Sequence, residues 1–143
     1  MAAERTAQVT WLGSLLDGSG TIDRVGSGAF GPLDVTWASR TEESNGRTSP
    51  EELIAAAHAS CFSMAFSGAL AKAGTPPERL ETSATVTFVP GEGITKSALT
   101  LRGSVPGMDD EAFREAADTA KENCPVSKAL AGVPEITVDA SLS

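Results

Sequence analysis

The sequence predicts an α+β fold in a single domain over residues 1–143: an antiparallel β-sheet with a long buried central helix and a second helix. Two observations support this prediction. Short segments with alternating apolar residues flank a long stretch that is almost free of charge between Glu52 and Lys72. The expected order is strands, long helix, hairpin, helix and strand, and an antiparallel sheet with helices on one face accommodates that order.

The first third of the chain is expected to form three strands, over residues 6–12, 21–25 and 33–38. In the first and third of these segments, apolar side chains recur at every second position, which is typical of a strand with one buried face. The glycines at positions 26 and 28 separate the second strand from the third, because glycine favours turns.

A long helix is expected from Pro50 to residue 73. Ser49 suits the N-cap, Pro50 suits the first helical position, and Glu52 can complete a capping box. Gly74 suits the C-terminal end, and Pro76 prevents continuation. A helix that is apolar or small on all sides is buried on most sides. It is therefore either the central helix of the domain or a helix covered by a second subunit.

The C-terminal half is expected to contain a hairpin, a helix and a last strand. The hairpin strands cover residues 80–89 and 94–105, and a turn rich in glycine joins them. The helix covers residues 109–123, with acidic residues at its start that complement the helix dipole. One or two further helical turns over 126–131 precede a strand over 135–142.

Composition and charge narrow the possible partners and the cellular compartment. The net charge is -8 at pH 7, which disfavours nucleic acid and anionic membranes as partners. The first residues are polar, no apolar signal segment follows them, and no apolar run is expected to be long enough to span a bilayer. A cytoplasmic location follows, where thiols are kept reduced. Two cysteines and one histidine are too few for a closed structural zinc site.

Each of the two cysteines has a reactive and an inert interpretation. Cys61 lies in the middle of the long helix among small and apolar neighbours, where a cysteine can be an inert core residue. A reactive Cys61 needs a cation from elsewhere, because burial raises a thiol pKa. Cys124 precedes Pro125 and could cap the next helix, whose N–H groups would favour a thiolate. Local chemistry alone therefore points to Cys124 as the more acidic thiol, with simple space filling as the alternative.

Three basic side chains are candidates to assist a thiol. Arg40 is expected at the end of the third strand and Arg47 in the polar loop that follows, and either could simply be solvated. His58 lies three residues before Cys61, on nearly the same face of the helix. It could act as a base for the thiol, or it could be a packed, hydrogen-bonded core histidine.

Two motifs in the chain resemble those of a known family. Residues 48–65, TSPEELIAAAHASCFSMA, resemble the signature helix of the OsmC/Ohr family, the osmotically inducible and organic-hydroperoxide-resistance proteins. Residues 123–130, NCPVSKAL, resemble the second signature of that family. The spacing of the two cysteines and the order of the elements are also similar over essentially the whole chain. His58, Gly20 and Arg40 resemble the OsmC branch more than the Ohr branch.

The resemblance implies a thiol-dependent peroxidase that reduces organic hydroperoxides, and hydrogen peroxide more weakly, in the response to oxidative and osmotic stress. Cys61 would be the peroxidatic cysteine and Cys124 the resolving cysteine, with Arg40 and Glu51 completing the site. This assignment overrules the local argument for Cys124 as the first nucleophile. The loop after Arg40 is one residue longer than in the family pattern.

The resemblance also implies that no metal, haem or flavin cofactor is needed, that an external dithiol of lipoyl type is the reductant, and that the protein is an intertwined homodimer. Helix geometry favours a dimer as well. Glu51 and Cys61 lie ten residues apart, which gives a rise of about 15 Å and a rotation that leaves them about 80° apart. Either an arginine bridges them, or groups from a partner chain complete the site. Two alternatives are a redox-sensing or binding protein without turnover, and a structural protein with inert cysteines.

Overall fold

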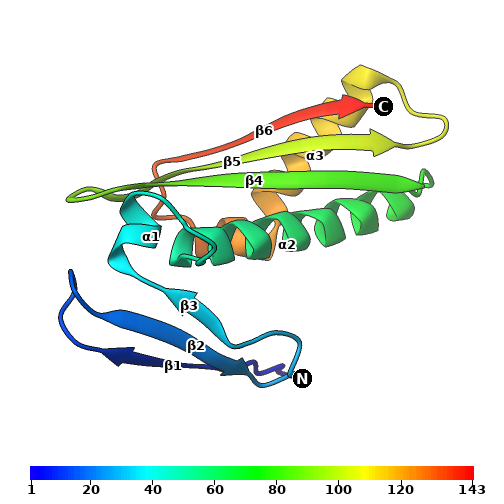
Figure 1. Cartoon of the computed structure of the whole chain (residues 1–143). Coiled ribbons are helices and arrows are strands. Elements are labelled where there is room, and N and C mark those ends of the chain that lie inside the picture. Colours follow the sequence, from blue (N-terminus) through cyan, green and yellow to red (C-terminus); the bar gives the residue numbers. More distant parts are fainter. The chain divides into compact units, whose positions relative to one another are not determined.

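The computed structural model describes all 143 residues and divides into two compact units (Figure 1). The N-terminal unit comprises Met1–Pro50 and the C-terminal unit Glu51–Ser143. The N-terminal unit contains β1 (Ala7–Leu12), β2 (Ser19–Val25), β3 (Leu33–Val35) and α1 (Trp37–Thr41). The C-terminal unit contains α2 (Pro50–Lys72, whose first residue ends the other unit), β4 (Arg79–Val89), β5 (Gly93–Ser104), α3 (Asp110–Asn123), α4 (Pro125–Ala129) and β6 (Glu135–Leu142).

The N-terminal unit is an antiparallel sheet in the order β1-β2-β3. Trp11 of β1 pairs with Gly20 of β2, and a side chain at Gly20 would lie 2.6 Å from the Trp11 ring and 2.9 Å from Val35. Glycine is therefore required where the tryptophan ring crosses β2. The other apolar side chains of β1 are uncovered in the single chain, with Val9 56% and Leu12 69% exposed.

The predicted third strand is too long, because β3 ends at Val35 and the chain turns into the short helix α1. Thr36 and Ser39 form a reciprocal capping box that starts this helix: the Ser39 N–H donates to Thr36 Oγ1 at 3.0 Å, and the Thr36 N–H donates to Ser39 Oγ at 2.9 Å. Arg40 therefore lies in the last turn of a helix, not at the end of a strand. Its guanidinium carbon lies 5.8 Å from the centre of the Trp37 ring, a cation–π contact.

Helix α2 begins and ends close to the predicted positions, and Gly74 follows it with a positive φ of 91°. The prediction that most sides are buried is wrong for the single chain. One row of side chains spaced four residues apart is buried: His58, Phe62, Phe66 and Leu70. The opposite face, which includes Met64 at 73% exposure, is uncovered. Small residues around the helix remove the amphipathic pattern that normally marks the buried face.

Contrary to the expectation that no apolar run reaches that length, α2 is long and apolar enough, by length and composition alone, to cross a membrane, with a mean hydropathy of 1.5 over its most apolar window. The core helix of a soluble domain passes the same test. Phe62 and Phe66 of α2 pack into the core of the C-terminal unit, so a single helix of this kind is weak evidence for a membrane span.

The second sheet has the order β4-β5-β6. The hairpin is confirmed, with Ala84 opposite Leu99 in antiparallel pairing. The last strand corrects the expectation of a fully antiparallel sheet, because β6 runs parallel to β5, with Val138 opposite Leu99. Helices α3 and α4 carry the chain from the end of β5 back to its start, and such a crossover produces a parallel pair.

The core of the C-terminal unit lies between one face of this sheet and the helices α2 and α3. Leu99 and Leu101 of β5 are fully buried, and the rings of Phe66 and Phe113 lie 5.3 Å apart between the helices. Gly103 accommodates Phe113, since a Cβ at that position would lie 2.7 Å from the ring. This packing holds α2 and the end of α3 against the same face of the sheet, which brings the two cysteines together.

Candidate cysteine site

Cys61 and Cys124 lie next to each other in the C-terminal unit. Cys61 is in the middle of α2, and Cys124 lies between α3 and α4. Cys61 packs against the core cluster that contains Cys124, the two thiols affect each other's acidity, and both cysteines are free. The site can therefore form a disulfide without a large rearrangement of the backbone.

The position of Cys124 follows from the local sequence. Its backbone N–H donates to the Ala120 carbonyl at 2.8 Å and ends α3, and its carbonyl accepts from Lys128 at 3.0 Å and begins α4. Pro125, which has no N–H, occupies the first position of α4. The residue between the two helices thus has extended backbone angles and a side chain that is directed into the core.

The two cysteines differ in their access to solvent. Cys124 is 0% exposed, whereas Cys61 is partly exposed. Cys61 is therefore the cysteine of the pair that lies closer to solvent.

The surroundings of Cys124 favour its thiolate. Burial opposes ionisation, but the N–H groups of Ser127 and Val126, the Cys61 thiol and the Ser127 hydroxyl together lower the Cys124 pKa below its usual value. The side chain makes no capping hydrogen bond of ordinary geometry, so the N–H groups act mainly as the positive end of α4. Cys124 is therefore the N-cap residue of α4, as the sequence predicts.

The surroundings of Cys61 have the opposite effect. Burial raises the pKa of the Cys61 thiol, the Val126 N–H lowers it, and Cys124 raises it through both the hydrogen bond and its charge. Within the C-terminal unit, therefore, Cys61 is the weaker acid of the pair.

His58 is a packed, hydrogen-bonded core histidine, the second of the two interpretations above. It is 0% exposed, and burial lowers its pKa. Nδ1 lies 2.6 Å from Ser97 Oγ, and Nε2 lies 2.8 Å from Ser127 Oγ. Because serine hydroxyls occupy both ring nitrogens, neither nitrogen is available to take a proton from Cys61.

Ser97 and Ser127 also belong to this site, although neither residue was predicted from the sequence. Ser97 occupies an inward position of β5, in phase with Leu99 and Leu101, where a polar side chain needs a buried partner. Ser127 is the third residue of α4, where a hydroxyl can reach back to the cap. The sequence did contain one indication of this role: Ser97 is a polar residue at a position of β5 where the alternating pattern predicts a buried side chain.

Glu51 and Arg40 lie in different units. Glu51 is in the first turn of α2 and is 6% exposed, so its carboxylate requires polar or charged partners. Arg40 is partly buried in the N-terminal unit, and Arg47 is exposed. A contact between Arg40 and either Glu51 or Cys61 stays a prediction.

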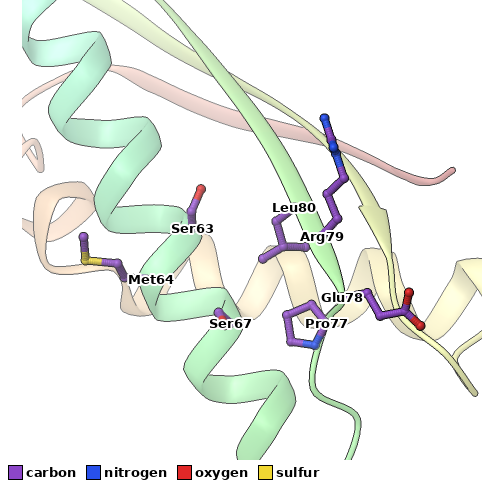
Figure 2. Close-up of a pocket in the computed structure, with 7 residues that line it drawn as sticks. All are labelled: Ser63, Met64, Ser67, Pro77, Glu78, Arg79 and Leu80. Atoms are coloured by element: carbon purple, nitrogen blue, oxygen red, sulfur yellow. The ribbon is translucent and has the colours of Figure 1, made fainter.

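A separate pocket of about 500 Å³ lies between the second half of α2 and the start of β4 (Figure 2). It is lined by Ser63, Met64, Ser67, Pro77, Glu78, Arg79 and Leu80. Neither cysteine lines this pocket, so it is not part of the cysteine site. The structure gathers no group of three or more His, Cys, Asp or Glu side chains that could hold a metal ion.

Comparison with known proteins identifies the family. Residues 43–139 match the family described as OsmC-like protein. The chain belongs to the OsmC family. It is 40% identical to Peroxiredoxin OsmC of Escherichia coli (strain K12) over 99% of both chains. It is 36% identical to the Organic hydroperoxide resistance protein of Xanthomonas axonopodis pv. citri over 64% of this chain and 65% of that one. The identity to Peroxiredoxin OsmC is higher and covers more of the chain, which places this protein in the OsmC branch of the family.

Solved structures confirm the OsmC-like fold. The organic hydroperoxide resistance protein OhrB of Bacillus subtilis has a TM-score of 0.64 and 25% identity, with 96% of this chain and 98% of that chain covered. An OsmC-like protein from Mycoplasma pneumoniae has a TM-score of 0.67 and 18% identity, with 96% of each chain covered. The α+β class and the OsmC-like fold predicted from the sequence are therefore confirmed.

Proposed function

We propose that this OsmC-family protein is a cysteine-based peroxidase that reduces organic hydroperoxides to alcohols and hydrogen peroxide more weakly. The observation that carries this proposal is the contact between two free cysteines, one partly exposed and one fully buried. The names of the Escherichia coli and Xanthomonas relatives, a peroxiredoxin and an organic hydroperoxide resistance protein, support the same reaction.

In the first step, the Cys61 thiolate attacks the terminal oxygen of the hydroperoxide. An S–O bond forms, the O–O bond breaks, and the alkoxide takes a proton and leaves as the alcohol. Cys61 becomes a sulfenic acid, oxidised by two electrons. The greater exposure of Cys61 supports its assignment as the attacking cysteine, although Cys124 has the lower pKa.

Cys61 needs a cation for this step, because burial and Cys124 both raise its pKa. In our proposal the Arg40 guanidinium supplies that charge and stabilises the oxygen on which charge develops. Glu51 orients Arg40 through a bidentate ion pair. The deep burial of Glu51 supports this role, since a carboxylate at 6% exposure requires a strong partner.

In the second step, Cys124 attacks the sulfur of the Cys61 sulfenic acid. An S–S bond forms, the S–O bond breaks, and the hydroxide leaves as water after taking a proton. The contact between the side chains and the lowered pKa of Cys124 both support this step. In the third step, a dithiol of lipoyl type reduces the disulfide by two thiol exchanges. The cycle uses no metal, haem or flavin.

The proposed working unit is an intertwined homodimer in the cytoplasm. Support comes from apolar surface that the single chain leaves uncovered, on α2 at Met64 and on the N-terminal sheet at Val9 and Leu12. The rotation between Glu51 and Cys61 along α2 also supports a site completed by another chain.

The proposed function is tested by following peroxide consumption with purified protein. Cumene hydroperoxide and a fatty-acid hydroperoxide are each compared with hydrogen peroxide, and a dithiol reductant is compared with a monothiol. We expect many turnovers with the dithiol and a higher kcat/KM for the organic substrates. A single oxidation of the cysteine pair without turnover would support a redox sensor. Unchanged thiols after addition of hydroperoxide would support a structural protein.

A further inference from the structure

A buried histidine lies behind the cysteine pair, and the proposed reaction does not use it. His58 is the only histidine in the chain and is 0% exposed. Its ring joins Ser97 of β5 to Ser127 of α4 through hydrogen bonds of 2.6 and 2.8 Å. Ser127 is the third residue of α4, whose N-cap is Cys124, and its hydroxyl lowers the pKa of the Cys124 thiol. A continuous chain of buried polar groups therefore runs from the sheet to the resolving cysteine.

The direction of these hydrogen bonds follows from counting protons. A serine hydroxyl has one proton, and Ser127 uses it when it donates to a Cys124 thiolate. Ser127 Oγ must then accept from His58 Nε2–H. A neutral imidazole has one N–H, so Nδ1 carries no proton and accepts from the Ser97 hydroxyl. Burial keeps the ring neutral, because it lowers the pKa of His58.

We propose that Ser97, His58 and Ser127 form a directional hydrogen-bond relay that stabilises the Cys124 thiolate and so speeds disulfide formation. His58 and Ser97 are positioning residues, since they act on Cys124 only through Ser127. The inference rests on the proposed function for the resolving step, and it assigns a task to three groups that the peroxide-reducing step does not need.

The balance of the resolving step requires no proton from the relay. The Cys124 thiolate and the Cys61 sulfenic acid give the disulfide and hydroxide, which takes a proton from solvent and leaves as water. The relay supplies a donor while Cys124 is charged and loses that role once Cys124 is a neutral disulfide sulfur. Apart from the relay and burial, the groups that act on the charge of Cys124 are the Val126 and Ser127 N–H groups and the titratable Cys61 thiol; no Asp, Glu, Lys or Arg is among them.

The first test is the tautomer of His58 by ¹⁵N NMR, which reports on this residue alone because the chain has no other histidine. The spectrum is recorded on the reduced protein above the pH at which ultraviolet absorbance shows the Cys124 thiolate. We expect the Nε2–H tautomer. An Nδ1–H tautomer or an imidazolium would overturn the relay, since Ser127 could not then receive a proton from Nε2 and donate to Cys124 in the stated direction.

The second test separates the two chemical steps in variants of Ser127 and His58. In a Cys61→Ala background, where Cys124 is the only thiol, Ser127→Ala should raise the Cys124 pKa by about one unit, a tenfold loss of thiolate at neutral pH. With both cysteines present, Ser127→Ala should slow disulfide formation about tenfold but should not slow sulfenic acid formation, because a less acidic Cys124 leaves more of the shared charge on Cys61. His58→Leu should act in the same direction, and His58→Gln should restore much of the rate, because its amide can donate to Ser127.

Ser63→Ala is the matched control. Ser63 lies on α2, as His58 does, and its hydroxyl donates a hydrogen bond to the Thr82 hydroxyl at 2.7 Å, not to a group beside Cys124. It should change neither the Cys124 pKa nor disulfide formation. Equal slowing of both steps by Ser127→Ala, or a Cys124 pKa that does not move, would overturn the proposal. The pKa measurement uses no hydroperoxide, so its outcome is independent of whether the protein is a peroxidase.

Discussion

The side chains of Cys61, in the middle of α2, and Cys124, at the cap of α4, lie together in the core of the C-terminal unit. Their interaction affects the two acidities in opposite directions: it raises the pKa of Cys61 and lowers the pKa of Cys124. When the reduced pair loses one proton, the position of the negative charge therefore depends on the groups around the two sulfurs.

The pair should show this coupling when either cysteine is removed. Cys124→Ala should lower the pKa of Cys61, because both the hydrogen bond and the charge that raise it are gone. Cys61→Ala should raise the pKa of Cys124, because a donor is lost. Thiolate absorbance against pH measures each remaining thiol in isolation. Shifts in the reverse directions would show that Cys124 donates to Cys61 instead.

The catalytic roles predict different failures in the two serine variants. Cys61→Ser should abolish hydroperoxide reduction, because the attacking sulfur is missing. Cys124→Ser should consume one equivalent of hydroperoxide and then stop or over-oxidise, because no thiol condenses with the sulfenic acid. Mass spectrometry of the intact chain distinguishes sulfenic, sulfinic and disulfide forms. Similar residual turnover in both variants would contradict the assigned order of the two cysteines.

Arg40 should control the reactivity of Cys61 more than His58 does. Arg40→Ala should raise the Cys61 pKa and slow its alkylation at neutral pH at least about tenfold, because a buried thiol ionises poorly without a cation. Arg47→Ala is the matched control, since Arg47 is exposed in the neighbouring loop. His58→Gln should leave Cys61 nearly unchanged, because serines occupy both ring nitrogens. If alkylation of Cys61 depends on His58 and not on Arg40, the wrong partner has been chosen.

The oligomeric state is open to a direct measurement. Sedimentation at micromolar concentration should show a dimer, because the single chain leaves the face of α2 that includes Met64 uncovered. Mixing equal amounts of Glu51→Ala and Cys61→Ser chains should restore about a quarter of the normal activity if Glu51 reaches the cysteine of its partner, since about half of the dimers are then mixed and one site of each mixed dimer is complete. An active monomer would refute the dimer, and a dimer without restored activity would place both residues in one chain.

His58 should make the free energy of unfolding depend on pH near neutrality. Its pKa in the folded chain lies below the unfolded value of 6.5 because the ring is buried, so the unfolded chain takes up a proton first as the pH falls. As the pH falls through 6.5, stability should therefore decrease, by at most about 1.4 kcal/mol for each pH unit, until the folded chain takes up the same proton. Urea titrations of the wild-type chain and of His58→Gln measure this effect. The variant should lack it, and an identical pH dependence in both proteins would show that another group titrates.

Local sequence signals predicted most of the elements. Pro50 and Gly74 bound α2 because they act on the backbone through short-range geometry, and Pro125 divides α3 from α4 for the same reason. The error at β3 also had a local cause, because the capping pair Thr36 and Ser39 turns an apolar segment into a helix. The direction of β6 had no local signal, since it depends on the path of the crossover.

The sequence by itself determined the family, the order of the elements and the two cysteines, because motifs, caps and periodicity are properties of short segments. Only the tertiary structure decided that Cys61 and Cys124 touch, that Cys124 is the buried member of the pair, and that His58 joins Ser97 to Ser127. These contacts join residues up to 69 positions apart, and long-range packing of α2 against β5 and α4 creates them. Burial and hydrogen bonding, which set the acidity of each thiol, exist only after that packing has formed.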